Sequence, residues 1–385
     1  MPYIFAFSGM LIIPNGDKKM VVFLIIATLA SLCYSKLNNI AIKDNFKNPY
    51  LLIIISSTIY GVFSYYYHGS SSREIRALIA ISLFLSCFPF KNIDNRFLLL
   101  IMLVGVFSST INSAYYIFYL GGGGRGVGHI NPIPYSTICA VISIISYSMF
   151  LLNRNIKLKL IYSIIIALNI YPLIVTQSRG VWLALFIGLI VVTSLYFKHA
   201  KFKNKKMTIF VSSIALIGLS YNIGDKITPR INQTFEELQQ IKIGKLDTSI
   251  GLRFQMWFAV PKIMNKGILI GNGDNHKYII KKLYEKGEIS SSLYRFNPPH
   301  YHNQFLDKLV KSGIVGIILL IMLMMYPLTI IKSQSIRNQM IIYGLLSIYF
   351  IASLTDVPLN HPQTLVVFLL ILFPLSTRDS GNNYD

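Results

Sequence analysis

The chain has 385 residues, of which 53% are hydrophobic and only 13% are charged. A soluble domain usually carries about 25% charged residues, so this composition excludes an ordinary soluble protein. Continuous apolar runs recur along the sequence, and they predict a polytopic helical membrane protein. The formal net charge of +21 does not indicate a nucleic-acid partner here, because cytoplasmic loops of membrane proteins collect Lys and Arg.

Twelve apolar segments predict an all-α chain with about twelve transmembrane helices. They cover approximately residues 2–14, 20–35, 50–67, 75–90, 97–119, 132–152, 157–175, 180–197, 208–223, 305–331, 338–355 and 363–376. The first segment is short for a spanning helix, and it lacks the basic start of a cleavable signal peptide. The three cysteines lie within apolar segments, so we expect free thiols at Cys33, Cys87 and Cys139.

The basic loops predict the orientation of these segments. The densest basic loop runs from Lys198 to Lys206, and we place it in the cytoplasm. Alternation then divides the chain into residues 1–223 with nine segments, a large external loop at residues 224–304, and residues 305–385 with three segments and a cytoplasmic tail. The loop stretches QTFEELQQIKI and GLRFQMWFAVPKIM have helical spacing, which predicts amphipathic helices on the membrane surface. Pro261 should kink or end the second helix.

Three arginines interrupt apolar or glycine-rich surroundings. Arg179, in TQSRGVWLAL, separates two apolar segments with almost no loop, so it must snorkel, form a pair or bind a ligand. Arg253 lies four positions before Trp257, and this pattern also suits an ordinary interfacial helix with an aromatic anchor. Arg125, in GGGGRGVG, could contact phosphates, although a glycine-rich loop outside a strand–helix unit does not by itself predict a phosphate site.

The stretch NPPHYHNQFLDKLVKSGIVG, Asn297 to Gly316, places two histidines where an apolar segment begins. If the helix starts near His300, then His302, Gly313 and Gly316 lie along one face, and the glycines would let another helix approach closely. A histidine held there is a candidate general base, because its ordinary pKa is near 6.5.

A second interpretation is that His300, His302 and Asn303 simply cap the helix and meet water. A metal site is not predicted, because the two histidines are two positions apart and no carboxylate or cysteine lies at ligand spacing. Asp356, in SLTDVPLNHP, could pair with an arginine, cap a helix or face water.

Arg179, Arg253 and His302 should all lie outside the membrane near one depth. Two guanidiniums suit a diphosphate, because each can bind phosphate oxygens with two parallel hydrogen bonds. A base beside them indicates transfer from a lipid-linked diphosphate donor. The chain has 15 acidic residues and no Asp-x-Asp pair, so we expect a metal-free site in which arginines stabilise the leaving pyrophosphate.

These motifs resemble those of bacterial O-antigen ligases, within a superfamily that also includes O-antigen polymerases. The ligase signature is His, then Asn, Ser or Gln, nine residues, Gly, two residues and Gly, and it reads HN-QFLDKLVKS-GIVG from His302 to Gly316. Arg179 to Leu183 looks like the family's Arg-x-x-x-Leu element, and Arg253 looks like its loop arginine. The arginines are shared with polymerases, whereas the full histidine motif is typical of ligases.

The resemblance implies a GT-C-like enzyme of the bacterial inner membrane with a site that faces the periplasm. It would transfer O-antigen from undecaprenyl pyrophosphate to lipid A–core by a metal-independent, inverting reaction without a cofactor. His302 would activate the acceptor hydroxyl, Arg179 and Arg253 would hold the pyrophosphate, and Asp356 matches an acidic position near the last segments. The alternatives are a polymerase with the same donor, and a lipid or glycan transporter, for which matching broken helices would be expected.

Overall fold

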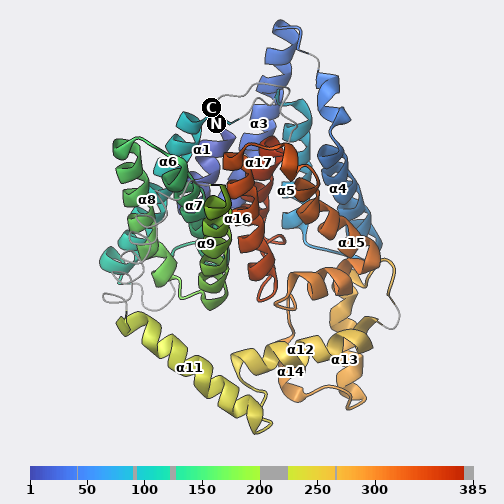
Figure 1. Ribbon diagram of the computed structural model, residues 1–385. Helices are drawn as coiled ribbons and strands as arrows, with labels where there is room; N and C mark the ends of the chain where they lie inside the picture. The colour runs from blue at the N-terminus through green and yellow to red at the C-terminus, as the bar shows by residue number, and fades with distance from the viewer. Residues whose placement is uncertain (41, 90–92, 122–126, 200–223, 265–266, 377–385) are drawn as a thin grey trace.

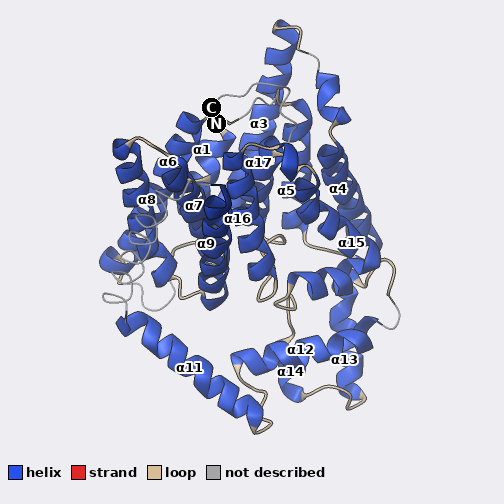
Figure 2. Ribbon diagram, viewed as in Figure 1, coloured by secondary structure: helices blue, strands red, loops and turns tan. Residues whose placement is uncertain are grey.

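The computed structural model describes residues 1–40, 42–89, 93–121, 127–199, 224–264 and 267–376, and over these ranges it contains helices and loops but no strand (Figure 2). The short helices and turns are α1 Pro2–Ala6, α2 Gly9–Ile12, η1 Ile42–Lys47, η2 Tyr115–Tyr119, η4 Gly273–Asn275, α14 Ser291–Phe296 and η5 Ile331–Ser333. The longer helices are α3 Gly16–Leu37, α4 Pro49–His68, α5 Ser72–Cys87, α6 Asn95–Ala114, α7 Pro132–Leu152, α8 Ile156–Val175, α9 Arg179–His199, α11 Gly224–Lys242, α12 Ser249–Met264, α13 His276–Glu285, α15 Gln304–Thr329, α16 Ile336–Ser353 and α17 Pro362–Leu375.

The helices form an upright bundle with a layer of helices across one end (Figure 1). Helices α11 to α14 make up this layer, which lies below the bundle in the view of Figure 1. The bundle contains α3 to α9 and α15 to α17. All the residues that the sequence singled out for chemistry, Arg125 apart, lie where the bundle meets this layer.

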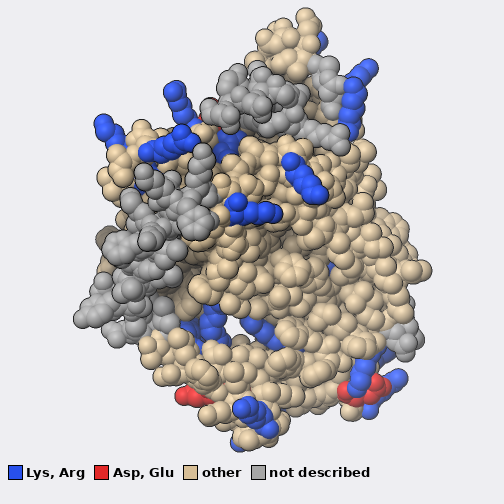
Figure 3. Space-filling view, in the orientation of Figure 1, with Lys and Arg blue, Asp and Glu red and all other residues tan. Residues whose placement is uncertain are grey.

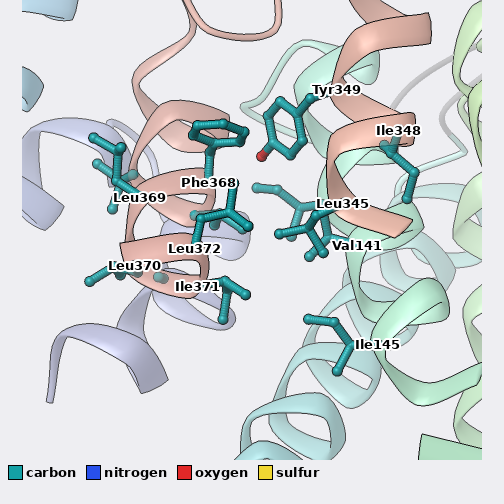
Figure 4. Close-up of a cluster of buried hydrophobic side chains, with 14 of the residues drawn as sticks. Val141, Ile145, Leu345, Ile348, Tyr349, Phe368, Leu369, Leu370, Ile371 and Leu372 are labelled. Carbon is teal, nitrogen blue, oxygen red and sulfur yellow. The ribbon is translucent and has the colours of Figure 1, made fainter. Parts of the chain in front are cut away.

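The core of the bundle is built on α7, which is buried along almost its whole length. Val141 and Ile145 of α7 face Leu345 and Tyr349 of α16 and apolar side chains of α17, including Phe368 (Figure 4). The rings of Tyr349 and Phe368 pack edge to face with centroids 4.7 Å apart. Helix α17 is fully buried from Thr364 onward and is apolar on all sides beyond that residue, as expected for a segment with no polar face.

Seven described helices are long and apolar enough to cross a membrane, so the chain is a polytopic helical membrane protein. They are α3, α4, α6 with η2, α7, α8, α9 and α15 with η5. Four further predicted segments correspond to shorter or less apolar helices, namely α1 with α2, α5, α16 and α17. The predicted segment at 208–223 lies outside the described residues, and the total of twelve stays a prediction.

Helix α15 is interrupted at Gly313, which has φ 64° and ψ −163°. The amides of Ile314 and Val315 donate to the carbonyls of Ile268 and Leu269 instead of to their own helix. A Cβ at Gly313 would lie 2.3 Å from the Leu269 carbonyl oxygen, so no other residue fits there. The close approach that we expected at this glycine is therefore real, but the partner is a loop backbone and not a helix.

The end layer has a small core of its own between α12, α13, α14 and the start of α15. Met256 and Ile263 of α12, Ile280 of α13, Leu293 of α14 and Tyr301 are all buried in it. The apolar side of α12 that we expected to meet lipid packs there instead, because α13 and α14 cover it. Pro261 lies inside α12, which continues to Met264.

Helix α11 does have the predicted amphipathic character. Ile231, Phe235 and Leu238 follow each other at helical spacing and are exposed, Phe235 by 62%. The neighbouring stripe of Arg230, Thr234 and Glu237 contacts the turn before α9. This leaves an apolar stripe on α11 free to meet lipid, as the prediction requires.

Candidate active site

The histidine segment lies just before α15, because this helix begins at Gln304 and not near His300. Asn303 is the N-cap residue, and its side-chain oxygen accepts the amides of Phe305 and Leu306 at 3.0 and 3.1 Å. His302 therefore precedes the helix and does not lie on its face, which corrects the expectation from sequence. Its φ of 48° is in the left-handed region, which is uncommon for histidine.

Tyr301, between the two histidines, is held by three hydrogen bonds. Its amide donates to Asp307 Oδ1 at 3.1 Å, and its carbonyl accepts from Trp257 Nε1 at 2.9 Å. Its hydroxyl lies 3.1 Å from Nδ1 of His276 in the small core. Trp257 therefore fixes the histidine segment and is not merely an interfacial anchor. The imidazoles of His300 and His302 are left side by side, with ring centroids 4.3 Å apart.

Asp356 lies beneath the two imidazoles and is only 3% exposed. Its Oδ1 is 3.4 Å from Nε2 of His300 and 3.9 Å from Nδ1 of His302. Asp356 Oδ2 and His302 Nδ1 are both buried without a hydrogen-bond partner among the described residues. The carboxylate thus pairs with the histidines and not with an arginine, and it stabilises positive charge on either ring.

The loop that carries Asp356 is tied to the start of α15. Gln304 accepts the amide of Leu359 at 2.8 Å and donates to Asn360 at 2.7 Å. Asn360 donates in turn to Asp307 Oδ2 at 2.6 Å. Gln304 and Asp307 are fully buried, so these bonds fix the distance between Asp356 and the histidines.

Burial sets the protonation of the cluster. Burial, and then the neighbouring His300, lower the pKa of His302 to about 4, against the opposing effect of Asp356. Burial alone would raise the pKa of the Asp356 carboxyl, but the hydrogen bond and charge of His300 lower it to about 2, with help from His361 and His302. At neutral pH, His302 is therefore an uncharged imidazole beside an ionised carboxylate, the state that a general base needs.

The same three residues could hold a metal ion. The ligand atoms of His300, His302 and Asp356 all lie within 4.8 Å of one another. We did not predict such a set from the sequence, because Asp356 is more than 50 positions from the histidines and no carboxylate lies near them at ligand spacing. The metal-free reaction stays a prediction, and chelation tests it.

Arg179 begins α9 and points to α11. Its guanidinium donates to Thr234 Oγ1 at 2.5 Å and to Glu237 Oε1 at 3.4 Å, and its side chain is 30% exposed. Glu237 is buried and also accepts the amide of Ile250, just before Arg253, at 2.9 Å. Arg179 is therefore paired and not simply snorkelling, and Glu237 links the two arginine-bearing helices.

Arg253 lies on α12 and makes no hydrogen bond or ion pair with another described residue. Burial lowers the pKa of its guanidinium, and the charge of Arg179 acts in the same direction, while Asp356 and Glu237 oppose it. Both arginines and Asp356 thus share one electrostatic environment. Figure 3 shows an opening between the bundle and the end layer, with Lys and Arg side chains at its edge. Arg253, a half-buried guanidinium, therefore favours an anionic ligand.

Comparison with known proteins matches residues 164–321 to the O-antigen ligase family. The chain carries an O-antigen ligase family domain. The matched region contains Arg179, Arg253 and His302 and ends before Asp356. An uncharacterized protein of Haemophilus influenzae is 28% identical over 205 residues, which cover 52% of this chain and 50% of that protein. The aligned region thus spans about half the length of this relative.

The structure adds residues to the site that the sequence analysis did not name. Glu237 orients Arg179, Asp307 joins Tyr301 to Asn360, and His361 lies 6.4 Å from His300 between ring centroids. An acidic residue such as Asp307 within an apolar segment is a general signal of function that could have been used. Arg125 lies outside the described residues.

Proposed function

We propose that this protein is an O-antigen ligase. It would transfer O-antigen from undecaprenyl pyrophosphate to lipid A–core at the periplasmic face of the bacterial inner membrane, in lipopolysaccharide biosynthesis. The observation that carries the proposal is the placement of the uncharged His302 3.9 Å from the Asp356 carboxylate, where it also feels the charge of Arg253. The guanidinium of Arg253 makes no hydrogen bond or ion pair with another described residue. The match of residues 164–321 to the O-antigen ligase family supports it.

In this proposal His302 is the general base. Asp356 near Nδ1 favours the tautomer with its proton on that nitrogen, which leaves Nε2 to take a proton from the acceptor hydroxyl. The acceptor oxygen forms a bond to the anomeric carbon of the first donor sugar as the proton leaves it. The imidazolium that results is stabilised by Asp356, as in other base–carboxylate pairs.

The arginines act on the leaving group. As the bond from the anomeric carbon to the pyrophosphate oxygen breaks, the electron pair stays with the pyrophosphate. Arg253 has free donors for the phosphate oxygens, and Arg179 adds a second guanidinium that Glu237 holds in place. Fixed cations aimed at developing charge stabilise such a transition state without a metal. The acceptor oxygen enters opposite the leaving pyrophosphate, so the anomeric configuration is inverted.

The test is a product assay with the purified protein in nanodiscs, lipid-linked O-glycan and lipid A–core, with and without EDTA. We expect glycan joined to lipid A–core at equal rates in both samples. Longer glycans still attached to the carrier lipid would assign a polymerase instead. No covalent product, in an assay where a known ligase works, would favour a transporter. A rate that EDTA abolishes and a divalent metal restores would overturn the metal-free mechanism and assign the His300, His302 and Asp356 cluster to the metal.

A further inference from the structure

A polar cavity of about 520 Å³ lies beside the histidine cluster, which is large enough for a small-molecule ligand. Its walls come from the starts of α3, α7, α15 and α17 and from the connection between α4 and α5. His300 and His361 belong to the lining, whereas His302, Arg179 and Arg253 do not. The cavity is therefore a separate space that meets the proposed catalytic cluster at His300.

One carboxylate in this cavity is buried and has no partner among the residues that the structure describes. Asp17, in the first turn of α3, is 8% exposed and makes no hydrogen bond or ion pair through its side chain with any described residue. The positive end of the α3 dipole favours a carboxylate there. The oxygens of Asp17 are not among the fully enclosed polar atoms that lack a partner, so they open onto the cavity that the residue lines. Such a group has strong unsatisfied acceptors that a ligand with hydroxyl groups would fill.

The charges of the lining are largely balanced by one another. Lys308 pairs with Glu74 at 2.5 Å, and Lys311 pairs with Asp307 at 3.0 Å. The side chains of Asp274 and Gln363 also line the cavity, and neither makes a hydrogen bond with another described side chain. Arg73 also lines the cavity, is exposed and makes no ion pair with a described residue. This one cation faces two unpaired carboxylates, Asp17 and Asp274, so the cavity suits a hydroxyl-rich ligand better than a phosphate.

The position of the cavity indicates which of the two substrates, donor or acceptor, it would bind. In the proposed inverting reaction, the nucleophile must approach the anomeric carbon from the side opposite to the pyrophosphate. The arginines that would hold the pyrophosphate, Arg179 and Arg253, are absent from the cavity lining. The acceptor is thus the substrate whose sugar would extend into this cavity.

We infer that the cavity lined by Asp17, Gln363, Asp274 and His300 binds the carbohydrate of the acceptor substrate. This inference rests on the proposed function. The carboxylates of Asp17 and Asp274 would accept hydrogen bonds from sugar hydroxyls, and the amide of Gln363 would both donate and accept. A reactive hydroxyl of the bound sugar would then pass His300 to reach His302.

Filling the cavity is the sharpest test. Ser71 is an exposed lining residue, and the adjacent Ser72 is exposed but does not line the cavity, so Ser71→Trp and Ser72→Trp form a matched pair. We expect Ser71→Trp to raise the KM for lipid A–core at least tenfold and to leave the KM for the lipid-linked donor within twofold. Ser72→Trp should leave both unchanged. Asp17→Ala and Gln363→Ala should each raise the acceptor KM severalfold.

Each other outcome contradicts the inference. A rise in the donor KM alone would assign the cavity to the donor glycan, and unchanged values for all cavity variants would remove the carbohydrate site. If the unmodified protein transfers no glycan, the proposed function fails. Calorimetry with lipid-free core oligosaccharide then tests separately whether the cavity binds a carbohydrate. If the oligosaccharide binds the unmodified protein and Ser71→Trp weakens that binding tenfold, the carbohydrate site stands. If it does not bind, the inference is overturned.

Discussion

His302 has a backbone conformation that few residues with a side chain adopt. A non-glycine residue in such a sparsely populated region costs on the order of 1–3 kcal/mol, and it persists only where its surroundings hold it. Here the three hydrogen bonds of Tyr301 and the Asn303 cap fix the residues on either side. The left-handed turn aims the ring at Asp356 and away from the helix, so the strain serves the placement of the proposed base.

Asparagine is the informative replacement at position 302. Asn tolerates the left-handed region better than other residues with a side chain, but its amide cannot act as a base. We expect His302→Asn to insert and fold normally and to reduce glycan transfer by about 10²- to 10⁴-fold. The product assay measures the rate, and size-exclusion chromatography measures folding. His199→Asn, at the exposed end of α9, is the control, and a rate within threefold of normal for His302→Asn would end the base assignment.

The lowered pKa of His302 predicts an unusual pH dependence. A pKa of about 4 means that the imidazole stays uncharged as the pH falls from 7 through 6.5, and it is protonated only nearer 4. The acid limb of kcat/KM reports the free enzyme, so its midpoint should lie well below 6. Rates measured from pH 4.5 to 8, with return of each sample to pH 7.5 as a control for unfolding, would check this. An acid limb centred at 6.5 would contradict the buried environment of His302.

Glu237 is one of the α11 residues that attach this helix to the proposed site, together with Arg230 and Thr234. Glu237 is buried and accepts hydrogen bonds from Arg179 and from the amide of Ile250. Removal of this carboxylate leaves both donors without this acceptor, which lowers the free energy of unfolding by about 1–3 kcal/mol. We expect Glu237→Ala to lower thermal stability in nanodiscs accordingly and to raise the KM for the lipid-linked donor, because Arg179 loses its fixed position.

Glu236 provides a matched control for Glu237. It is the preceding residue of α11 and is exposed. Glu236→Ala should change stability by no more than about 0.5 kcal/mol, as is usual for surface positions. Equal effects of the two substitutions on stability and on the donor KM would show that α11 is not held through Glu237.

At the level of helices, the sequence was most informative where apolar runs are long. The runs at 132–152 and 157–175 coincide with α7 and α8 within one residue at either end. The start of α15 was placed too early. Prolines indicate only a region in which a helix can begin, whereas the Asn303 side chain caps the helix and so determines its first residue. The burial of α12 could not be foreseen, since its cover, α13 and α14, comes from later in the chain.

The same contrast applies to the site. Arg179, Arg253 and His302 could be found because charged or basic groups in apolar surroundings need a reason to be there. Glu237 and Asp307 could not be given a role, because that role lies in contacts with residues that only the fold brings near.

On the scale of the whole molecule, the predicted topology places residues 224–304 in the periplasm. In a chain whose three cysteines are replaced by alanine, Lys281→Cys should react with a membrane-impermeant maleimide in intact spheroplasts. Lys281 is suitable because its side chain is 57% exposed. Lys157→Cys, exposed at the start of α8 and predicted to be cytoplasmic, should react only after lysis. The reverse pattern would place the histidine cluster on the cytoplasmic side.

The break in α15 at Gly313 bears on how this protein tolerates different bilayers. A helix adjusts to a thicker or thinner bilayer by tilting, at a cost of fractions of a kcal/mol per Å of mismatch. The residues of α15 after Val315 can tilt in this way. Val310 before Gly313, and Ile314 and Val315 directly after it, are bonded to the 268–272 loop, and Asp307 is held by its own network. Changes in lipid length should therefore alter the tilt of α15 beyond Val315 while the distances among His300, His302 and Asp356 stay constant.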